Sequence, residues 1–251
     1  MVNDLELAKR VFSCIDNTTL NGTDSEQSVE AFCRRTRNLT LNTDHVAAVC
    51  VYPRFVACAK RVLAGSGIRV ASVAGAFPHG QLPIELKVQE VRRVVADGAD
   101  EVDVVISRGL LLEGDDDTVY DEVAAMKEAC GGRTLKVILE TGELPSPALI
   151  ARASQLVMAG GADFIKTSTG KIGVGATPEA AEVMLNCIKD NVKINKKTVG
   201  FKAAGGIRKP EEAVRYAEMA KKIMGDDYVN SQTFRIGASS LTESLFSNLT
   251  F

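Results

Sequence analysis

Eight short apolar runs alternate along the chain with amphipathic helical stretches, at a repeat of about thirty residues. The runs are rich in β-branched residues, which favours strands, and the stretches between them follow the helical period. Strands that alternate with helices predict a parallel sheet with helical crossovers. The candidate strands are FSCID (12–16), VAAVCVY (46–52), RVASVAG (69–75), EVDVVIS (101–107), LKVILET (135–141), FIKTST (164–169), TVGFKAA (198–204) and TFRIGAS (233–239).

The stretches between the runs carry helix start and stop signals. The stretch 24–37 begins with acidic residues and ends with basic ones, as the helix dipole favours. The stretch 83–98 begins with a proline and stops at a glycine, and 209–225 repeats this plan. The remaining helical candidates are 117–132, 146–161 and 177–191.

Eight strand–helix units predict a closed (β/α)8 barrel, also called a TIM barrel, which typically needs about 250 residues. A doubly wound open sheet is the competing fold. It normally uses fewer strands and places a G-x-G-x-x-G turn after the first one, and no such turn follows residues 12–16. No linker or change of composition divides the sequence. We therefore expect residues 1–251 to form a single α/β domain, with a short N-terminal helix before the first strand.

The composition argues against several classes of protein. The chain has 30 basic and 32 acidic residues, so no excess of positive charge is available for nucleic acid. No apolar run approaches the ~20 residues needed to span a bilayer, and residues 1–10 lack the apolar centre of a signal peptide. The six cysteines are scattered, as is typical of reduced thiols. We expect a cytoplasmic protein that binds neither nucleic acid nor membranes.

The sequence offers few histidines that could bind a metal ion. His45 and His79 are the only histidines, which argues against a histidine-rich metal site and against a Ser-His-Asp triad. We expect chemistry without a metal or another cofactor. In a barrel of this kind, the reacting side chains gather at the C-terminal ends of the strands.

Several charged residues lie in the C-terminal halves of the candidate strands. A single charge there usually belongs to a solvated rim or to an ion pair that stabilises the fold. Asp103, Lys166 and Lys202 differ because apolar strand residues adjoin them, and a buried charge must be paired or neutralised. The other charged residues of this set are Asp16, Glu140 and Arg235, and Lys136 and Glu140 could pair with any of these charges inside the barrel mouth.

Lys166 and Lys202 lie at similar depths on strands that are neighbours in a sequentially wound barrel. Burial and like charge both favour the neutral amine, so the pKa of at least one of the two lysines should fall. A neutral amine attacks carbonyls and forms a Schiff base, which withdraws electrons from a neighbouring C–C bond. Asp103 is a carboxylate suitably placed for proton transfer. The spacing leaves open which lysine is the nucleophile.

Glycine-rich loops follow the last two candidate strands, at 204–213 and 236–245. In phosphate-binding barrels these loops and a short following helix commonly hold the phosphate. Their glycines let backbone N–H groups approach an anion closely, and a helix N-terminus also favours negative charge. The segment STGK (168–171) offers further donors, and Arg208 adds positive charge from the rim. The sequence therefore predicts a phosphate site beside the two lysines.

Taken together, these segments resemble the class I deoxyribose-phosphate aldolases (the 2-deoxyribose-5-phosphate aldolase family). The resemblance runs in order from about residue 14 to residue 245, and FIKTSTGK is its most specific part. It implies a (β/α)8 barrel that reversibly cleaves 2-deoxy-D-ribose 5-phosphate into D-glyceraldehyde 3-phosphate and acetaldehyde, in deoxyribonucleotide catabolism. The matching segments are DNTTL, AVCVYPRF, FPHG, EVDVVIS, KVILETGEL, GADFIKTSTGK, TVGFKAAGGIR and RIGASSL.

The resemblance also assigns roles to single residues. It implies that Lys166 forms the Schiff base, that Lys202 lowers the pKa of Lys166 and takes part in a proton relay, and that Asp103 donates and accepts protons. Asp16 and Thr169 are implied to bind the sugar phosphate substrate. The family needs no metal or cofactor and forms homodimers or tetramers. The implied phosphate contacts are Gly170, Lys171, Gly205, Gly206, Gly237, Ser239 and Ser240.

The sequence departs from the family pattern in two places. Ala203 stands where the family has a proline, and we expect this change to be tolerated. Some family members have a longer C-terminal tail that ends in a tyrosine thought to reach the active site. This sequence ends in SNLTF, and Phe251 has no phenolic proton. We expect the basic chemistry to remain, whereas the rate and the proton transfers depend on that tail.

Two other functions stay open at this point. One is another Schiff-base enzyme for sugar phosphates, such as a transaldolase-like enzyme, or an isomerase. The other is a non-catalytic barrel that serves as a scaffold. The presence of Lys166, Lys202 and Asp103 together favours an enzyme over a scaffold.

Overall fold

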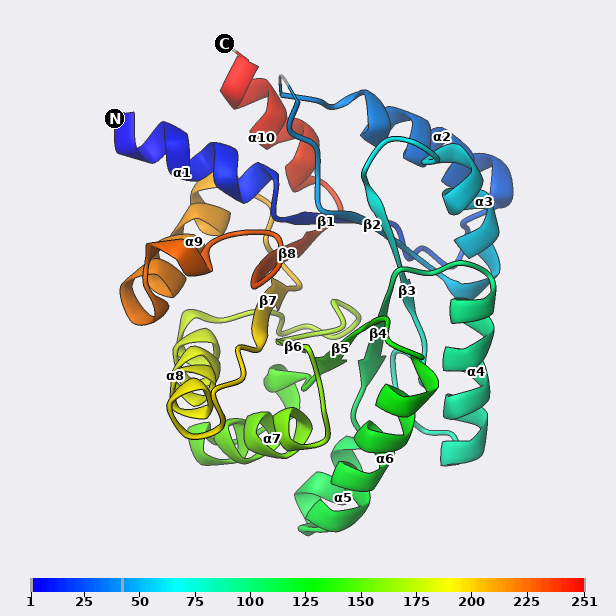
Figure 1. Cartoon of the computed structure of the whole chain (residues 1–251), viewed down its shortest axis with the longest axis vertical. Helices are drawn as coiled ribbons and strands as arrows, with labels where there is room; N and C mark the ends of the chain where they lie inside the picture. The colour runs from blue at the N-terminus through cyan, green and yellow to red at the C-terminus, as the bar shows by residue number, and fades with distance from the viewer. Residues whose placement is uncertain (1, 42, 251) are drawn as a thin grey trace.

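The computed structural model describes residues 2–41 and 43–250, so Phe251 lies outside the described residues. Within that part of the chain, eight parallel strands close into a barrel in the order of the sequence, and helices surround it (Figure 1). The predicted single-domain (β/α)8 barrel is confirmed. The strands are β1 (Ile15–Thr18), β2 (Ala48–Val51), β3 (Arg69–Val73), β4 (Glu101–Val105), β5 (Thr134–Ile138), β6 (Phe164–Lys166), β7 (Gly200–Ala204) and β8 (Phe234–Ala238).

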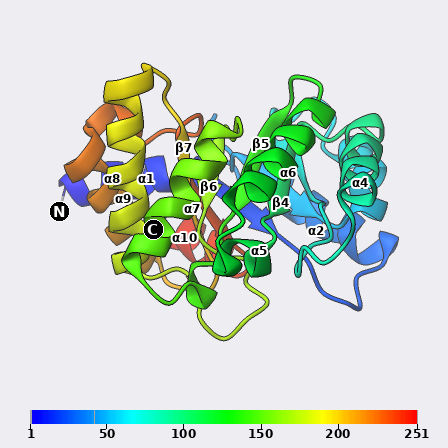
Figure 2. The same cartoon turned by 90° about the horizontal axis from the view of Figure 1, so that it is seen from below.

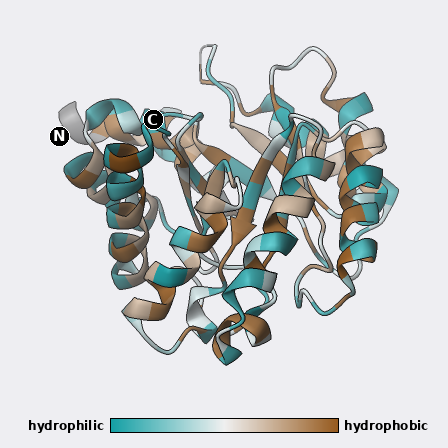
Figure 3. Cartoon of the chain, turned by 60° about the horizontal axis from the view of Figure 1, so that its bottom comes forward, coloured by the Kyte–Doolittle hydropathy of each residue, from teal (hydrophilic) through white to brown (hydrophobic). Residues whose placement is uncertain are grey.

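The helices form an outer layer, which the view from below also shows (Figure 2). In Figure 3 the helices carry mixed bands of apolar and polar residues, as amphipathic helices packed on a sheet should. No helix in the described ranges is long and apolar enough to cross a membrane. The helices are α1 (Val2–Phe12), α2 (Glu26–Asn38), α3 (Val56–Val62), α4 (Ile84–Ala96), α5 (Arg108–Glu113), α6 (Asp116–Ala129), α7 (Pro147–Ala159), α8 (Pro178–Asn195), α9 (Pro210–Met224) and α10 (Leu241–Thr250), with 3-10 turns η1 (Pro53–Phe55), η2 (Thr141–Glu143) and η3 (Asp226–Tyr228).

Side-chain caps fix where several helices begin after the strands. Ser25, Ser146 and Thr177 each accept a hydrogen bond from the backbone N–H three residues further on. Such a cap satisfies one of the N–H groups that a helix start leaves free. A proline follows directly at the first position of α7 and α8. The loops at the C-terminal end of the barrel therefore have defined end points.

The first strand begins later than the sequence predicts. The candidate strand 12–16 overlaps the end of α1, and β1 covers Ile15–Thr18. Val11 and Phe12 are fully buried as the last apolar residues of that amphipathic helix. The apolar run is thus shared between a helix end and a strand start, which periodicity over five residues does not separate. The short helices α3 and α5 were also not predicted, because seven and six residues are too few to establish a helical period.

The register of the strands brings charged side chains to matching heights. Lys166 on β6 pairs with Lys202 on β7, and Asp103 on β4 pairs with Lys136 on β5. Successive residues of a strand point to opposite faces, so Glu101 and Asp103 on β4 share one face. The barrel therefore places charges from several strands in its interior.

A glycine makes room for an aromatic ring inside this barrel. A Cβ atom on Gly200 would lie 2.3 Å from a ring carbon of Phe164, which is the Cα partner of Gly200 on β6. The Arg235 guanidinium in turn lies over the Phe164 ring, 5.4 Å from its centre. Gly200 thus allows the ring to occupy the position against which a buried arginine packs.

We predict that Gly200→Ala lowers the free energy of unfolding by about 1–3 kcal/mol, because the new methyl group overpacks the barrel against Phe164. Gly22→Ala is the matched control, since a Cβ atom at Gly22 meets no atom within 4 Å. This control should stay within about 1 kcal/mol of the parent protein. Urea unfolding followed by circular dichroism measures both, and equal stability of the two variants would contradict the prediction.

Candidate active site

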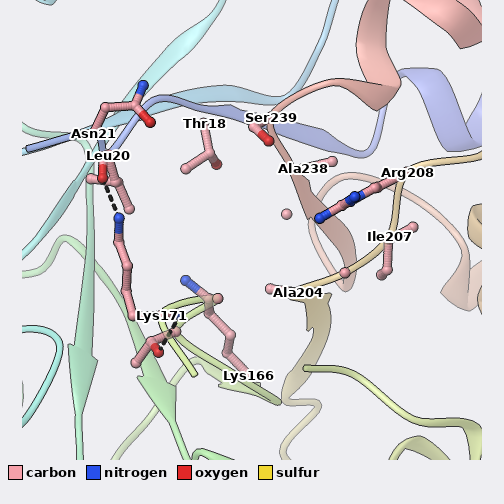
Figure 4. Close-up of a pocket in the computed structure, with 15 residues that line it drawn as sticks. Thr18, Leu20, Asn21, Lys166, Lys171, Ala204, Ile207, Arg208, Ala238 and Ser239 are labelled. Carbon is pink, nitrogen blue, oxygen red and sulfur yellow. Dashed lines mark hydrogen bonds between the residues drawn. The ribbon is translucent and has the colours of Figure 1, made fainter. Parts of the chain in front are cut away.

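A cavity of about 250 Å³ opens among the loops that follow β1, β6, β7 and β8. Figure 4 shows the amine of Lys166 pointing into its centre, with Arg208 reaching in from another wall. Lys171 lies on a third side, where its ammonium group donates to the carbonyl of Leu20. The lining residues are Thr18, Leu20, Asn21, Lys166, Thr169, Gly170, Lys171, Ala204, Gly205, Gly206, Ile207, Arg208, Gly237, Ala238 and Ser239.

Below this cavity, Lys166 and Lys202 meet on one carboxylate oxygen. Asp103 Oδ2 lies 2.9 Å from Lys166 Nζ and 2.7 Å from Lys202 Nζ. Asp103 and Lys202 are fully buried, whereas the side chain of Lys166 keeps 5% of its surface exposed. The structure thus brings together the two lysines and the aspartate that the sequence singles out, and Lys166 is the member of this trio that lines the cavity.

A third lysine lies at the centre of the same group. Lys136 Nζ is 2.9 Å from Asp103 Oδ1, 3.1 Å from Asp16 Oδ2 and 2.6 Å from Glu101 Oε2. All four residues are fully buried, and they come from three strands, β1, β4 and β5. Lys136 therefore joins three carboxylates inside the barrel.

The remaining contacts close the group. Lys202 Nζ also lies 2.5 Å from Asp16 Oδ2, and Arg235 contacts Asp16 at 2.6 Å and Glu101 at 2.7 Å. We call this set the barrel cluster. Its members are the carboxylates Asp16, Glu101 and Asp103 and the cationic side chains Lys136, Lys166, Lys202 and Arg235.

The charges of the barrel cluster balance only when one amine is neutral. Three carboxylates face four buried groups that can be positive, while a further cation, Arg69, contacts Glu101 from a side chain that is 36% exposed to solvent. Lys136, Lys202 and Arg235 each contact two or three of the carboxylates, whereas Lys166 contacts Asp103 alone. An uncompensated buried charge is costly, so the least paired group should give up its proton. Geometry therefore selects Lys166 as the neutral amine.

The pKa directions agree with this choice. Burial lowers the pKa of Lys166, the attraction of Asp103 opposes this effect, and Lys202 lowers the pKa further, so that the net shift is downward. Burial also disfavours the charged form of Lys202, but Asp103 and Asp16 outweigh it and raise the pKa of Lys202. The fall of one lysine pKa is therefore as predicted. The two amines do not depress one another equally, because Lys202 lies between two carboxylates and stays charged.

The carboxylates of the barrel cluster stay ionised. Burial alone would raise their pKa values, but the neighbouring cations reverse the shift. Lys136 and Arg235 lower the pKa of Glu101 to about 2, and Lys136, Lys166 and Lys202 hold the pKa of Asp103 well below its usual range. The site therefore places the amine whose pKa is lowered next to an ionised carboxylate, which in turn contacts a charged ammonium group.

A buried glutamate anchors the loop after β6. Glu140 has left-handed backbone angles (φ 56°, ψ 58°) and accepts hydrogen bonds from both the N–H (3.1 Å) and the hydroxyl group of Thr169. The Thr169 oxygen accepts the N–H of Lys171 at 3.0 Å. Left-handed backbone angles are strained for a residue other than glycine and persist where surrounding contacts fix them. The loop that carries Gly170 and Lys171 is therefore held by a chain of hydrogen bonds that starts at Glu140.

Glycines allow the loops after β6 and β7 to pack backbone against backbone. A Cβ atom on Gly175 would lie 2.2 Å from the carbonyl oxygen of Gly205, so only glycine fits there. Gly170, Gly205 and Gly206 have φ values of 75°, 89° and 82°, which L side chains rarely adopt. At Gly237 glycine is needed for a different reason, because a Cβ atom at this position would lie 3.0 Å from Lys202 Cε. These loops can thus present N–H groups to the cavity at close range.

The residues predicted from the sequence divide into three groups. Thr169 and most of the predicted phosphate contacts line the cavity together with Lys166. Asp16, Asp103 and Lys202 lie in the barrel cluster beneath them. Ser240 is exposed directly before α10 and is not among the lining residues of the cavity. The predicted phosphate contacts that line the cavity are Gly170, Lys171, Gly205, Gly206, Gly237 and Ser239.

Sequence reasoning did not single out Glu101, which binds both Lys136 and Arg235. A signal was present, because Glu101 precedes Asp103 by two residues and a strand points such residues to one face. Lys136 was noted as a residue that could pair with the other charges, and Arg235 was noted as a charge on a strand, but their partners were not identified. Their partners come from other strands of the barrel, so only the register reveals the pairs.

Comparisons with known proteins identify the family to which this barrel belongs. A family model described as DeoC/LacD family aldolase matches residues 10–245. The crystal structure of a candidate deoxyribose-phosphate aldolase from Coccidioides immitis is 27% identical, with a TM-score of 0.84 over 96% of this chain and 86% of that chain. A deoxyribose phosphate aldolase from Aeropyrum pernix, described as tetrameric, is 26% identical, with a TM-score of 0.77 over 99% of this chain and 97% of that chain.

A candidate deoxyribose-phosphate aldolase from Toxoplasma gondii ME49 shares the fold, with a TM-score of 0.88 at 23% identity over 100% of this chain and 98% of that chain. The family match begins before β1 and ends after β8, so it includes every strand that contributes to the barrel cluster. The chain belongs to the DeoC/LacD family of aldolases.

Proposed function

We propose that this protein is a Schiff-base aldolase that reversibly cleaves 2-deoxy-D-ribose 5-phosphate into D-glyceraldehyde 3-phosphate and acetaldehyde, in deoxyribose phosphate catabolism. The observation that carries the proposal is the lowered pKa of Lys166, whose amine points into a cavity while every other cation of the barrel cluster is held by two or more carboxylates. A neutral amine in such a position is the nucleophile that this chemistry needs.

In the first step, the neutral Lys166 amine attacks the aldehyde carbon of the open-chain sugar. The resulting carbinolamine loses water and becomes an iminium ion. Both events need proton transfers to and from oxygen and nitrogen. Asp103 Oδ2 lies 2.9 Å from Lys166 Nζ and 2.7 Å from the ammonium group of Lys202, so these two residues are suited to exchange the protons.

In the second step, the bond between C2 and C3 breaks. The proton of the C3 hydroxyl group leaves to a base, C3 becomes the aldehyde of D-glyceraldehyde 3-phosphate, and the electron pair moves toward the iminium nitrogen to form an enamine. The enamine then takes a proton at C2, and water hydrolyses the imine to release acetaldehyde. Lys166 regains its amine, so the cycle consumes no cofactor.

The loops around the cavity support a phosphate at one end of the substrate. Gly170, Gly205 and Gly206 line the cavity with positive φ values, which suit a loop that brings its backbone close to an anion, and Arg208 adds a positive charge from the rim. We propose that these residues bind the phosphate together with Lys171, Gly237, Ser239 and Ser240, and that Thr169 and Asp16 act near the sugar. By likeness to the tetrameric protein from Aeropyrum pernix, we also propose a homo-oligomer, a dimer or a tetramer, in the cytoplasm.

We predict that sodium borohydride, added with acetaldehyde, attaches an ethyl group to Lys166, because reduction traps the Schiff base. Peptide mapping by mass spectrometry locates the adduct. The variant Lys166→Met should show no adduct in the cavity and should lose activity by a factor of roughly 10⁴ or more. Folded protein without an adduct at Lys166 would rule out the proposal.

The same trapping reaction separates this function from other aldolase reactions of the family. Sugar phosphates of different length and phosphorylated ketoses are offered in place of 2-deoxy-D-ribose 5-phosphate. Release of acetaldehyde with only the deoxy sugar supports the proposed substrate. Efficient trapping with a ketose phosphate, without any acetaldehyde, would assign the chain to a different substrate.

We predict that Lys202→Leu reduces kcat/KM by roughly 10²-fold at neutral pH and by much less at alkaline pH. Without the charge of Lys202, the two aspartates that it contacts favour a protonated Lys166, so the pKa of Lys166 rises. The neutral amine then forms only at higher pH. Lys202→Arg is the matched control, because it keeps the positive charge. The rising limb of its kcat/KM against pH should lie closer to that of the parent protein. A pH profile of unchanged shape in Lys202→Leu would contradict this prediction.

A further inference from the structure

We infer that Arg69 and Glu101, at the end of the barrel opposite the cavity, are positioning residues that set the charge state of Lys166 through a chain of ion pairs. The inference rests on the proposed function, because it concerns the same nucleophile. Arg69 and Glu101 touch neither Lys166 nor the lining of the cavity. They act on Lys166 through the residues between them.

The chain of ion pairs is continuous. Arg69 contacts Glu101 Oε1 at 3.0 Å, and Glu101 Oε2 contacts Lys136 Nζ at 2.6 Å. Lys136 contacts Asp103 Oδ1 at 2.9 Å, and the other oxygen of Asp103 contacts Lys166 at 2.9 Å. Positive and negative groups alternate along the whole path. A change at one end therefore changes the pairing of each later group.

The strand positions show that this path runs along the barrel. Arg69 and Glu101 are the first residues of β3 and β4, at the N-terminal ends of these strands. Asp103 lies two residues further along β4, level with Lys136, and Lys166 is the last residue of β6. Charges at the N-terminal face usually serve stability, whereas catalysis occurs at the opposite face. Here the ion pairs connect the two faces.

Arg69 also differs from the rest of the path in its exposure to solvent. Its side chain is 36% exposed, whereas Glu101, Lys136 and Asp103 are fully buried. It lines a second cavity at its own end of the barrel, together with Asp44 and His45. The charge at this end can therefore be removed by substitution with less damage to packing than at any of the buried positions.

The direction of each effect follows from the way Lys136 is shared. Glu101 and Asp103 both bind Lys136. When the charge of Glu101 is removed, Lys136 interacts more strongly with Asp103. Asp103 then holds a proton on Lys166 less strongly, and the loss of one negative charge acts in the same direction. Removal of Arg69 has the opposite effect on Lys166. Glu101 then attracts Lys136 and Arg235 more strongly, so Asp103 interacts more strongly with Lys166 and stabilises its protonated form.

The Arg69 and Glu101 substitutions leave the other charged and titratable groups near Lys166 in place. The Cys50 thiol faces the same space, and burial raises its pKa to about 11, so it is neutral at the pH values of interest. The charged and titratable groups of the barrel interior are Asp16 on β1, Cys50 on β2, Arg69 on β3, Glu101 and Asp103 on β4, Lys136 on β5, Lys166 on β6, Lys202 on β7 and Arg235 on β8.

The experiment measures how fast acetic anhydride acetylates Lys166 as a function of pH, with mass spectrometry of the peptide that carries it. Only the neutral amine reacts, so the midpoint of the curve reports the ionisation of Lys166 without any turnover. In Arg69→Gln the midpoint should move up by on the order of half a pH unit. The rising limb of kcat/KM should move by the same amount.

Glu101→Gln should move both midpoints in the opposite direction, toward lower pH, because it removes a negative charge from the path. Arg61→Gln is the matched control, since Arg61 lies on α3 with a side chain 61% exposed and forms its ion pairs with Glu26 and Glu30 of α2. It should leave the midpoint unchanged. If Glu101→Gln does not fold, Arg69→Gln alone decides the question.

The outcomes separate the inference from the proposed function. An ordinary lysine midpoint for Lys166 in the parent protein, near the reference value of about 10.4, would argue against the proposed nucleophile itself. A lowered midpoint in the parent that Arg69→Gln leaves in place, in folded protein, would overturn the inference alone. A lower activity of Arg69→Gln without a shift of the midpoint would assign Arg69 a purely structural role.

Discussion

The structure depends on the pairing of three buried carboxylates on β1 and β4 with cations on β5, β7 and β8. Lys136, Lys202 and Arg235 satisfy Asp16, Glu101 and Asp103, and each ion pair joins two different strands. Such a cluster is costly to desolvate, and its members are tolerated only because they are paired. The same pairing leaves Lys166 with a single partner, and its pKa falls for this reason. Stability and reactivity thus share one arrangement of charges.

The loops complete the site by means that do not involve charge pairing. Glu140 holds Thr169, and Thr169 holds the N–H of Lys171, so the segment after β6 has a fixed course over the cavity. Gly175 and Gly205 let this segment pack directly on the loop after β7. An anion that enters the cavity therefore meets backbone groups that are already ordered, which reduces the entropy lost on binding.

Much of this arrangement can be predicted from the sequence, because strand–helix alternation has a strong period and apolar neighbours mark a buried charge. Asp103, Lys166 and Lys202 stand out for this reason. The choice between the two lysines could not be made from spacing, since it depends on Asp16, which lies 186 residues from Lys202 in the sequence. Glu101 and the anchoring role of Glu140 escaped for the same reason. The start of β1 was misplaced because α1 ends in the same apolar run.

The charge balance of the barrel cluster also bears on the energy of the proposed intermediates. An iminium ion at Lys166 places a fourth positive charge beside three buried carboxylates, at a side chain that is 5% exposed. The enamine that follows cleavage is neutral and restores the balance. The protein interior therefore raises the energy of the iminium relative to the enamine, which favours the flow of electrons out of the C2–C3 bond. The protein thus acts on the reacting bond through the total charge of its interior, in addition to the groups that touch the substrate.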